Sequence, residues 1–100
     1  MARLGEIADA RSGDKGTGAN IGILAHDATG YARLERELTA DRVAAYFAPM
    51  NPGPVTRYEL PNLLALNFTL PQILAGGGSR SLRIDAQGKS LGQVLLEMEL

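Results

Sequence analysis

The chain has 100 residues, of which 45% are hydrophobic and 21% are charged, as is typical of one folded domain. Its 10 Lys and Arg nearly balance its 11 Asp and Glu, which excludes the strong positive charge that nonspecific binding to nucleic acids or anionic membranes requires. The chain has no cysteine and one histidine, His26, which excludes disulfides, a thiol nucleophile and a multi-histidine metal centre.

The first eleven residues lack the apolar core of a signal peptide, because they include Arg3, Glu6, Asp9 and Arg11. The longest apolar stretch near mid-chain, residues 63–66, is far shorter than the roughly 20 residues of a membrane-spanning helix. We therefore expect a soluble cytoplasmic protein, a single domain over residues 1–100, with neither a membrane nor a nucleic acid as partner.

Two strands are predicted near the N-terminus. Residues 3–10 alternate faintly, as a short or edge strand does, and residues 20–26 have two apolar faces, as in a central strand. Residues 12–19 contain three glycines, and we expect them to form a loop too long for a two-residue hairpin turn, with glycine allowing positive φ.

The apolar spacing becomes helical after residue 30. One stripe contains Tyr31, Leu34 and Leu38. Arg33 and Glu37 are four residues apart and can pair on the helix surface. Thr39 is expected to cap a second helical piece, which Pro49 and the turn that follows bring to an end.

The second half of the chain continues with alternating elements. Residues 55–60 read as a strand with Thr56, Tyr58 and Leu60 on one face. Residues 62–70 are predicted to be a helix with Asn62 as its N-cap, since leucines recur at helical spacing at Leu63, Leu66 and Leu70. Residues 82–85 read as a short strand, and a capping box at Ser90 predicts a final helix.

The order of elements predicts an α+β sandwich: a four-stranded mixed sheet with helices packed mainly on one face. A domain of this length buries roughly 65% of the surface that its unfolded chain exposes. Association that covers the other sheet face would stabilise it, so we expect a homo-oligomer or a complex.

The glycine-rich segment from Ala10 to Asn20 is a candidate anion site. Its amides could surround a phosphate or carboxylate, with Lys15 as the charge and Ser12 or Thr17 as a hydroxyl donor. It is not a P-loop, because Lys15 precedes Gly16 and a strand follows. The alternative, which we favour from the residues alone, is a connection in which Ser12 and Asp14 satisfy their own backbone.

Basic residues far apart in the sequence could join Lys15 in a cationic pocket for a multiply charged ligand. They are Arg57, Arg80, Arg83 and Lys89. The simpler interpretation places Arg80 and Arg83 on the solvated face of a strand, with Asp85 as a partner.

A second polar group surrounds the third strand. It comprises Arg57, Tyr58, Glu59, Pro61, Asn62 and Asn67. Glu59 could act as a general base with Arg57 or Tyr58 as an electrostatic helper, but no nucleophile accompanies them. Structural use explains them as well, with Asn62 as a helix cap and Glu59 paired to an arginine. We assign His26 no catalytic role.

Three segments together carry a family resemblance: ARSGDKGTGANIGILA, RYELPNLLALNFTL and GGGSRSLRIDAQGKSLGQVLLEMEL. They resemble the ferredoxin-fold domain of the AtuA-like, or acyclic terpene utilisation, family over nearly the whole chain. The resemblance implies a ferredoxin-like sandwich and a larger partner chain, because in that family the domain often follows a larger one. The family's association with branched acyl-CoA catabolism suggests a phosphate-bearing thioester as ligand.

Two function classes follow. We prefer a small accessory or assembly subunit that associates with itself or with a larger AtuA-type chain and completes an anion site with the Lys15 loop. The alternative is an enzyme, or half of one, acting on an acyl-CoA or carboxylate substrate. No cofactor, metal or catalytic residue is assigned. The expected ligand-binding residues are Ser12, Asp14, Lys15, Asn20, Arg57, Glu59, Asn62, Arg83 and Lys89.

Overall fold

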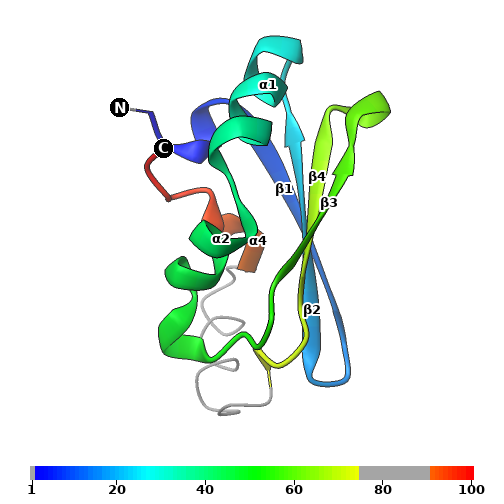
Figure 1. Cartoon of the computed structure of the whole chain (residues 1–100), viewed down its shortest axis with the longest axis vertical. Helices are drawn as coiled ribbons and strands as arrows, with labels where there is room; N and C mark the ends of the chain where they lie inside the picture. Colours follow the sequence, from blue (N-terminus) through cyan, green and yellow to red (C-terminus); the bar gives the residue numbers. More distant parts are fainter. Residues whose placement is uncertain (1, 75–90) are drawn as a thin grey trace.

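A four-stranded sheet forms one layer of the structure, and helices form the other (Figure 1). The computed structural model describes residues 2–74 and 91–100, with Lys15 described by its backbone alone. The sheet order is β1-β2-β4-β3, from strands β1 (Ala8–Lys15), β2 (Gly18–Ala25), β4 (Ala65–Leu70) and β3 (Thr56–Leu60). The predicted α+β two-layer sandwich is confirmed, although these strands all pair antiparallel and do not form a mixed sheet.

Strands β1 and β2 form a long hairpin, so the predicted loop at residues 12–19 is wrong. Eight residue pairs join the strands, from Ala8↔Ala25 to Lys15↔Gly18, and only two residues make the turn. Gly16 there has a φ of +60°, as a type II′ hairpin turn requires of its first central residue. The glycines suggested a loop because pairing with a partner strand is not visible in local composition. The first strand also begins later than predicted, after a 3-10 helix, η1 (Leu4–Glu6).

The two central helices confirm the sequence prediction. Helix α1 (Ala28–Glu37) is capped by Asp27, and α2 (Ala40–Tyr46) by Thr39, whose hydroxyl accepts from the amide of Arg42 at 3.1 Å. The expected pair between Arg33 and Glu37 forms at 3.1 Å. A 3-10 turn, η2 (Ala48–Met50), follows α2. Fully buried side chains of this layer, Leu34, Leu38 and Val43, pack on the sheet.

The predicted helix at residues 62–70 is wrong, because most of this segment is strand β4. Only a 3-10 turn, η3 (Pro61–Leu63), precedes the strand, so Asn62 caps no α-helix and lies exposed in that turn. Leu66, Phe68 and Leu70 alternate along β4 and are fully buried against the helices. Both neighbours of β4 are antiparallel strands, and this non-local pairing supports a strand where the leucine spacing favoured a helix.

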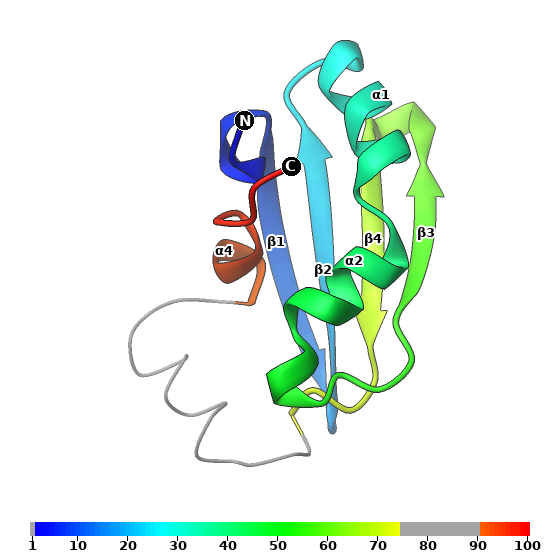
Figure 2. The ribbon, with the colours of Figure 1, turned by 60° about the vertical axis from the view of Figure 1, so that its left-hand side comes forward.

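The chain ends beside its beginning (Figure 2). The predicted final helix is present as a short one, α4 (Leu91–Leu95), and a β-bridge joins Arg3 to Glu99. The strand predicted at residues 82–85 lies outside the described residues. None of the described helices is long and apolar enough to cross a membrane.

Candidate functional site

The predicted site residues are divided between the two faces of the sheet. Alternation along each strand places Ser12 and Arg57 in one cross-strand row, on the helix-covered face. Asn20 belongs to the next row, on the face that no described helix covers, which we call the open face. The sheet itself therefore separates Asn20 from Ser12 and Arg57.

Ser12 has a structural partner. Its Oγ accepts a hydrogen bond from the backbone amide of Gly92 at 2.6 Å, which docks the start of α4 onto β1. A Cβ added to Gly92 would lie 2.7 Å from the same oxygen, so the contact is close. Asp14 follows two residues later on the same face and is exposed near the hairpin tip.

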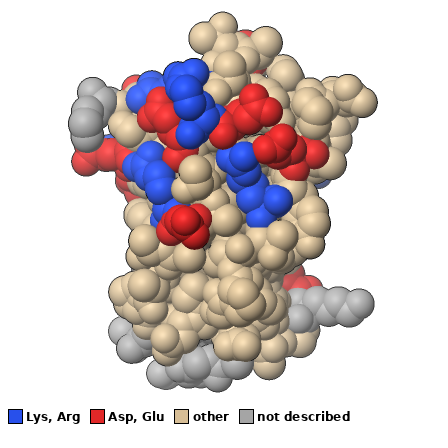
Figure 3. Space-filling model, in the orientation of Figure 1, with Lys and Arg blue, Asp and Glu red and all other residues tan. Residues whose placement is uncertain are grey.

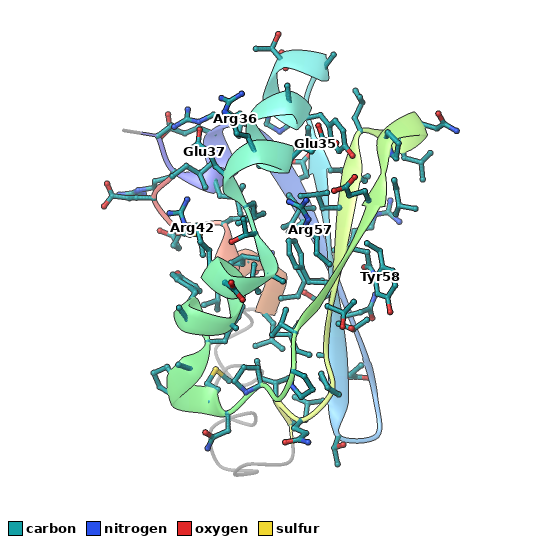
Figure 4. All side chains as sticks on the ribbon, in the orientation of Figure 1. Glu35, Arg36, Glu37, Arg42, Arg57 and Tyr58 are labelled. Atoms are coloured by element: carbon teal, nitrogen blue, oxygen red, sulfur yellow. The ribbon has the colours of Figure 1, made fainter. Side chains whose placement is uncertain are left out.

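Arg57 also has structural partners, in the helix layer. Its Nη1 donates to the carbonyl oxygens of Glu35 at 2.9 Å and Leu38 at 3.1 Å, both at the C-terminal end of α1. Its Nη2 lies 2.6 Å from Oε2 of Glu59, the pair that the sequence indicated. Figure 4 shows Arg57 directed toward the helices, while Tyr58 points to the other side of β3. Arg57 thus satisfies helix carbonyls that would otherwise have no partner.

Of the side chains proposed for the cationic pocket, the structure describes that of Arg57. Ser12 and Arg57 lie on opposite edge strands, three strand spacings or roughly 14 Å apart. Arg80, Arg83 and Lys89 lie outside the described residues, as does the side chain of Lys15. Convergence of these groups stays a prediction.

On the open face, Asn20 approaches Asn67, a member of the second polar group that the sequence indicated. Its Nδ2 donates to Oδ1 of Asn67 at 3.4 Å, across the β2–β4 pair. Gly22 pairs with Asn67 on one side and with Arg11 on the other, and Tyr58 follows Asn67 on β3. Two polar positions that the sequence singled out are therefore neighbours, and a glycine keeps the surface beside them shallow.

The open face carries no charged side chain on β2, β4 or β3. Its residues there are Asn20, Gly22, Leu24, Thr56, Tyr58, Leu60, Ala65, Asn67 and Thr69. Among the described residues of this face, the charged ones, Asp9 and Arg11, are both on the edge strand β1. Around α1, by contrast, acidic and basic side chains alternate over the upper half of the surface (Figure 3). The charge of the molecule is thus unevenly divided between its faces.

Tyr31 is a buried polar residue that the sequence indicated only as part of an apolar stripe. It is 7% exposed, and its hydroxyl has no hydrogen-bond partner among the described residues. Burial, followed by the negative charges of Glu35 and Glu59, raises the pKa of Tyr31, and Arg57 opposes the shift. Its hydroxyl therefore stays protonated beside the carboxylates.

Two surface hollows of the described chain lie elsewhere. One of about 410 Å³ is at the start of α1, where Glu6, His26, Arg33 and Arg36 line it. Another of about 410 Å³ lies between Arg3 and Glu97. Neither is lined by a predicted ligand-binding residue. In residues 2–74 and 91–100, no three His, Asp or Glu side chains gather as metal ligands would.

These observations define the class of protein: a two-layer α+β sandwich with an antiparallel sheet, one face of which is open and largely uncharged. Residues 2–100 match the sequence model of the AtuA ferredoxin-like domain, and the chain belongs to this family. Comparison with curated proteins and with solved structures finds no match.

Proposed function

We propose that the protein is a small accessory or assembly subunit that associates through its open face with a larger AtuA-type chain or with another copy. The single observation that carries this proposal is the lack of charge across β2, β4 and β3 on that face. Interface centres are depleted of charged residues, while solvated sheet faces usually carry them. The two exposed apolar side chains of the face, Tyr58 and Leu60, are 51% and 41% exposed.

The β1–β2 hairpin belongs to the same proposal. Three strand spacings and strands of five to eight residues give a face of roughly 300 Å², less than half of what one partner contributes to a standard interface. A stable contact therefore needs a neighbouring element, and the turn of the β1–β2 hairpin, at Gly16 and Thr17, lies at one end of this face. In this position Lys15 would be brought to an anionic ligand, such as an acyl-CoA-like thioester, held by the partner chain.

Copurification tests the docking face. Asn67 lies near its centre and is partly exposed, so Asn67→Lys adds a charge there without entering the core. We expect this variant to lose copurification with a coexpressed larger AtuA-type chain. Thr29→Lys adds the same charge to an exposed position on α1 and should copurify as the unchanged protein does. Equal recovery of both variants would contradict docking through the open face.

Ligand binding tests the role of Lys15 separately. The purified complex is titrated with a coenzyme A thioester as the probe. Lys15→Ala should weaken binding of the thioester and reduce the salt dependence of that binding. Arg11→Ala, which removes a cation from the same strand, is the matched control. Affinity unchanged by Lys15→Ala would remove the hairpin from the site while leaving the docking proposal standing.

A further inference from the structure

Strand β3 has one edge that no described element covers. It pairs with β4 along its other edge and lies at the side of the sheet, with the helices over its neighbours (Figure 2). The opposite edge strand, β1, has α4 beside it, held by the bond between Ser12 and Gly92. Native proteins usually protect such an edge with charged side chains, Lys above all, or with Pro. β3 contains no Lys or Pro among its five residues, and its two charged side chains, Arg57 and Glu59, are paired with each other.

Exposed apolar side chains concentrate at this edge. The large hydrophobic residues that are exposed in the described chain are Tyr58, Leu60 and Leu63, and Leu63 is 66% exposed. All three lie on β3 or in the turn η3 that follows it. An open edge next to exposed apolar side chains favours pairing with another strand.

We infer that β3 pairs antiparallel with β3 of a second copy of this chain, with the two-fold axis at Tyr58. The sequence Thr56-Arg57-Tyr58-Glu59-Leu60 is complementary to itself in this register. Arg57 of each copy lies opposite Glu59 of the other, on the helix-covered side. Tyr58 lies opposite its own equivalent, and Thr56 opposite Leu60, on the open-face side. Such isologous contacts make opposite-charge and aromatic cross-strand pairs.

The geometry of β3 leaves the charged groups available for this pairing. The bond within the chain uses Oε2 of Glu59, and the side chain of Glu59 is 45% exposed, so its second oxygen can accept from Arg57 of the second copy. Pro54 and Pro61 flank the strand and limit the pairing to about five residues. The contact uses the strand edge and not the open face, so it does not depend on the proposed function.

A short interface of this kind is weak. Contacts that bury less than about 1,200 Å² are typical of transient complexes, so we expect a dissociation constant in the micromolar range or weaker. Sedimentation velocity of the purified chain, from about 1 µM to about 1 mM, should show a monomer converting to a dimer. A monomer throughout this range overturns the inference.

Cross-linking tests the register. The chain has no cysteine, so Tyr58→Cys introduces a single thiol at the two-fold axis, where opposed Cβ atoms are about 4.5–5.5 Å apart. A short bis-maleimide should convert this variant into a covalent dimer at concentrations where the dimer forms. Asn67→Cys places the thiol on the neighbouring strand and the same face, and its yield of covalent dimer should be at least about fivefold lower. Equal yields would point to face-to-face packing and overturn edge pairing.

Charge reversal tests the complementarity. Glu59→Lys places two ammonium groups opposite the two Arg57 side chains of the dimer and should weaken dimerisation at least about tenfold. Glu97→Lys makes the same charge change and also removes an exposed pair, with Arg3, but it lies away from β3. It should leave dimerisation unchanged. Equal dimerisation by both variants overturns the inference. A chain that stays monomeric alone and binds only a larger AtuA-type chain overturns the choice of a second copy as the partner.

Discussion

Arg57 on β3 donates a hydrogen bond to the carbonyl oxygen of Leu38, the C-cap residue of α1, at 3.1 Å. Together with its bond to the carbonyl oxygen of Glu35, this contact ties the edge strand to the end of the helix. The side chain is 19% exposed, so these are largely desolvated, charge-assisted bonds. A residue that looked like a ligand group in the sequence therefore connects the two layers.

Replacement of Arg57 should destabilise the fold. Arg57→Ala leaves two helix carbonyls without their donor, and we expect it to lower the free energy of unfolding by about 2 kcal/mol. Arg57→Lys should recover only part of this loss, because an ammonium group cannot reproduce the planar fork of donors. Urea denaturation measures both variants.

Arg36→Ala is the control for the loss of an arginine. Arg36 pairs with Glu37 at 3.6 Å with 69% of its side chain exposed, and its removal should change stability by less than about 0.5 kcal/mol. If Arg57→Ala proves as mild as Arg36→Ala, the bonds between β3 and α1 contribute little to stability.

Tyr31, which is buried, and Tyr46, which is partly buried, should respond differently to loss of their hydroxyls. Tyr31→Phe removes a hydroxyl with no partner among the described residues, so the free energy of unfolding should be unchanged or higher by up to about 1 kcal/mol. Tyr46→Phe removes a bond of 2.9 Å to the carbonyl oxygen of Val94 and should cost about 1 kcal/mol. Thermal unfolding of both variants shows which one is less stable. A larger loss of stability for Tyr31→Phe than for Tyr46→Phe would reveal a partner for the hydroxyl of Tyr31.

Alkaline pH should destabilise the protein. Burial first, and nearby carboxylates second, raise the pKa of Tyr31 above its ordinary value of 10.0. The folded chain then keeps a proton that the unfolded chain releases, so stability is complete below pH 10.0 and falls as the pH rises toward the folded-state pKa. Urea unfolding at a series of pH values from about 8 to about 11 measures this decline.

Tyr31→Phe should make that decline shallower, because it removes the phenol responsible. Tyr46→Phe should have a similar effect, since burial, with Glu97, also raises the pKa of Tyr46. Tyr58→Phe removes an exposed phenol and serves as the control. A decline that is the same in all three variants would show that other groups determine it.

Gly92 should not tolerate a side chain. A Cβ there would lie 2.7 Å from Oγ of Ser12 and 3.0 Å from Cβ of Ala10, so α4 would have to move away from β1. We expect Gly92→Ala to lower the free energy of unfolding by about 1–3 kcal/mol, despite the better helix propensity of alanine.

Gly22→Ala is the matched substitution. The new Cβ would approach Oδ1 of Asn67 no closer than 3.8 Å, an ordinary contact on the open face. This variant should therefore fold with stability close to that of the unchanged chain. Circular dichroism and urea unfolding compare the two, and equal stability would mean that α4 does not need its close contact with β1.

The sequence alone determined the elements whose signals are local. The apolar stripe of α1, the Thr39 cap of α2 and the alternation of residues 56–60 each follow from the period of one element, and each is present in the structure. The family assignment was likewise available from motifs spread along the chain, and residues 2–100 match the family.

The elements that depend on distant partners became clear from the packing of the whole chain. Residues 65–70 place leucines at helical spacing and also at strand alternation, and antiparallel pairing with β2 and β3 selects the strand. The glycines of residues 12–19 have no local preference for a strand. They lie in strands because β1 and β2 pair with each other over eight residues each, which leaves only two residues for the turn. For Arg57, alternation shows which neighbours share its face, but only the packing of α1 on that face supplies the carbonyls that it binds.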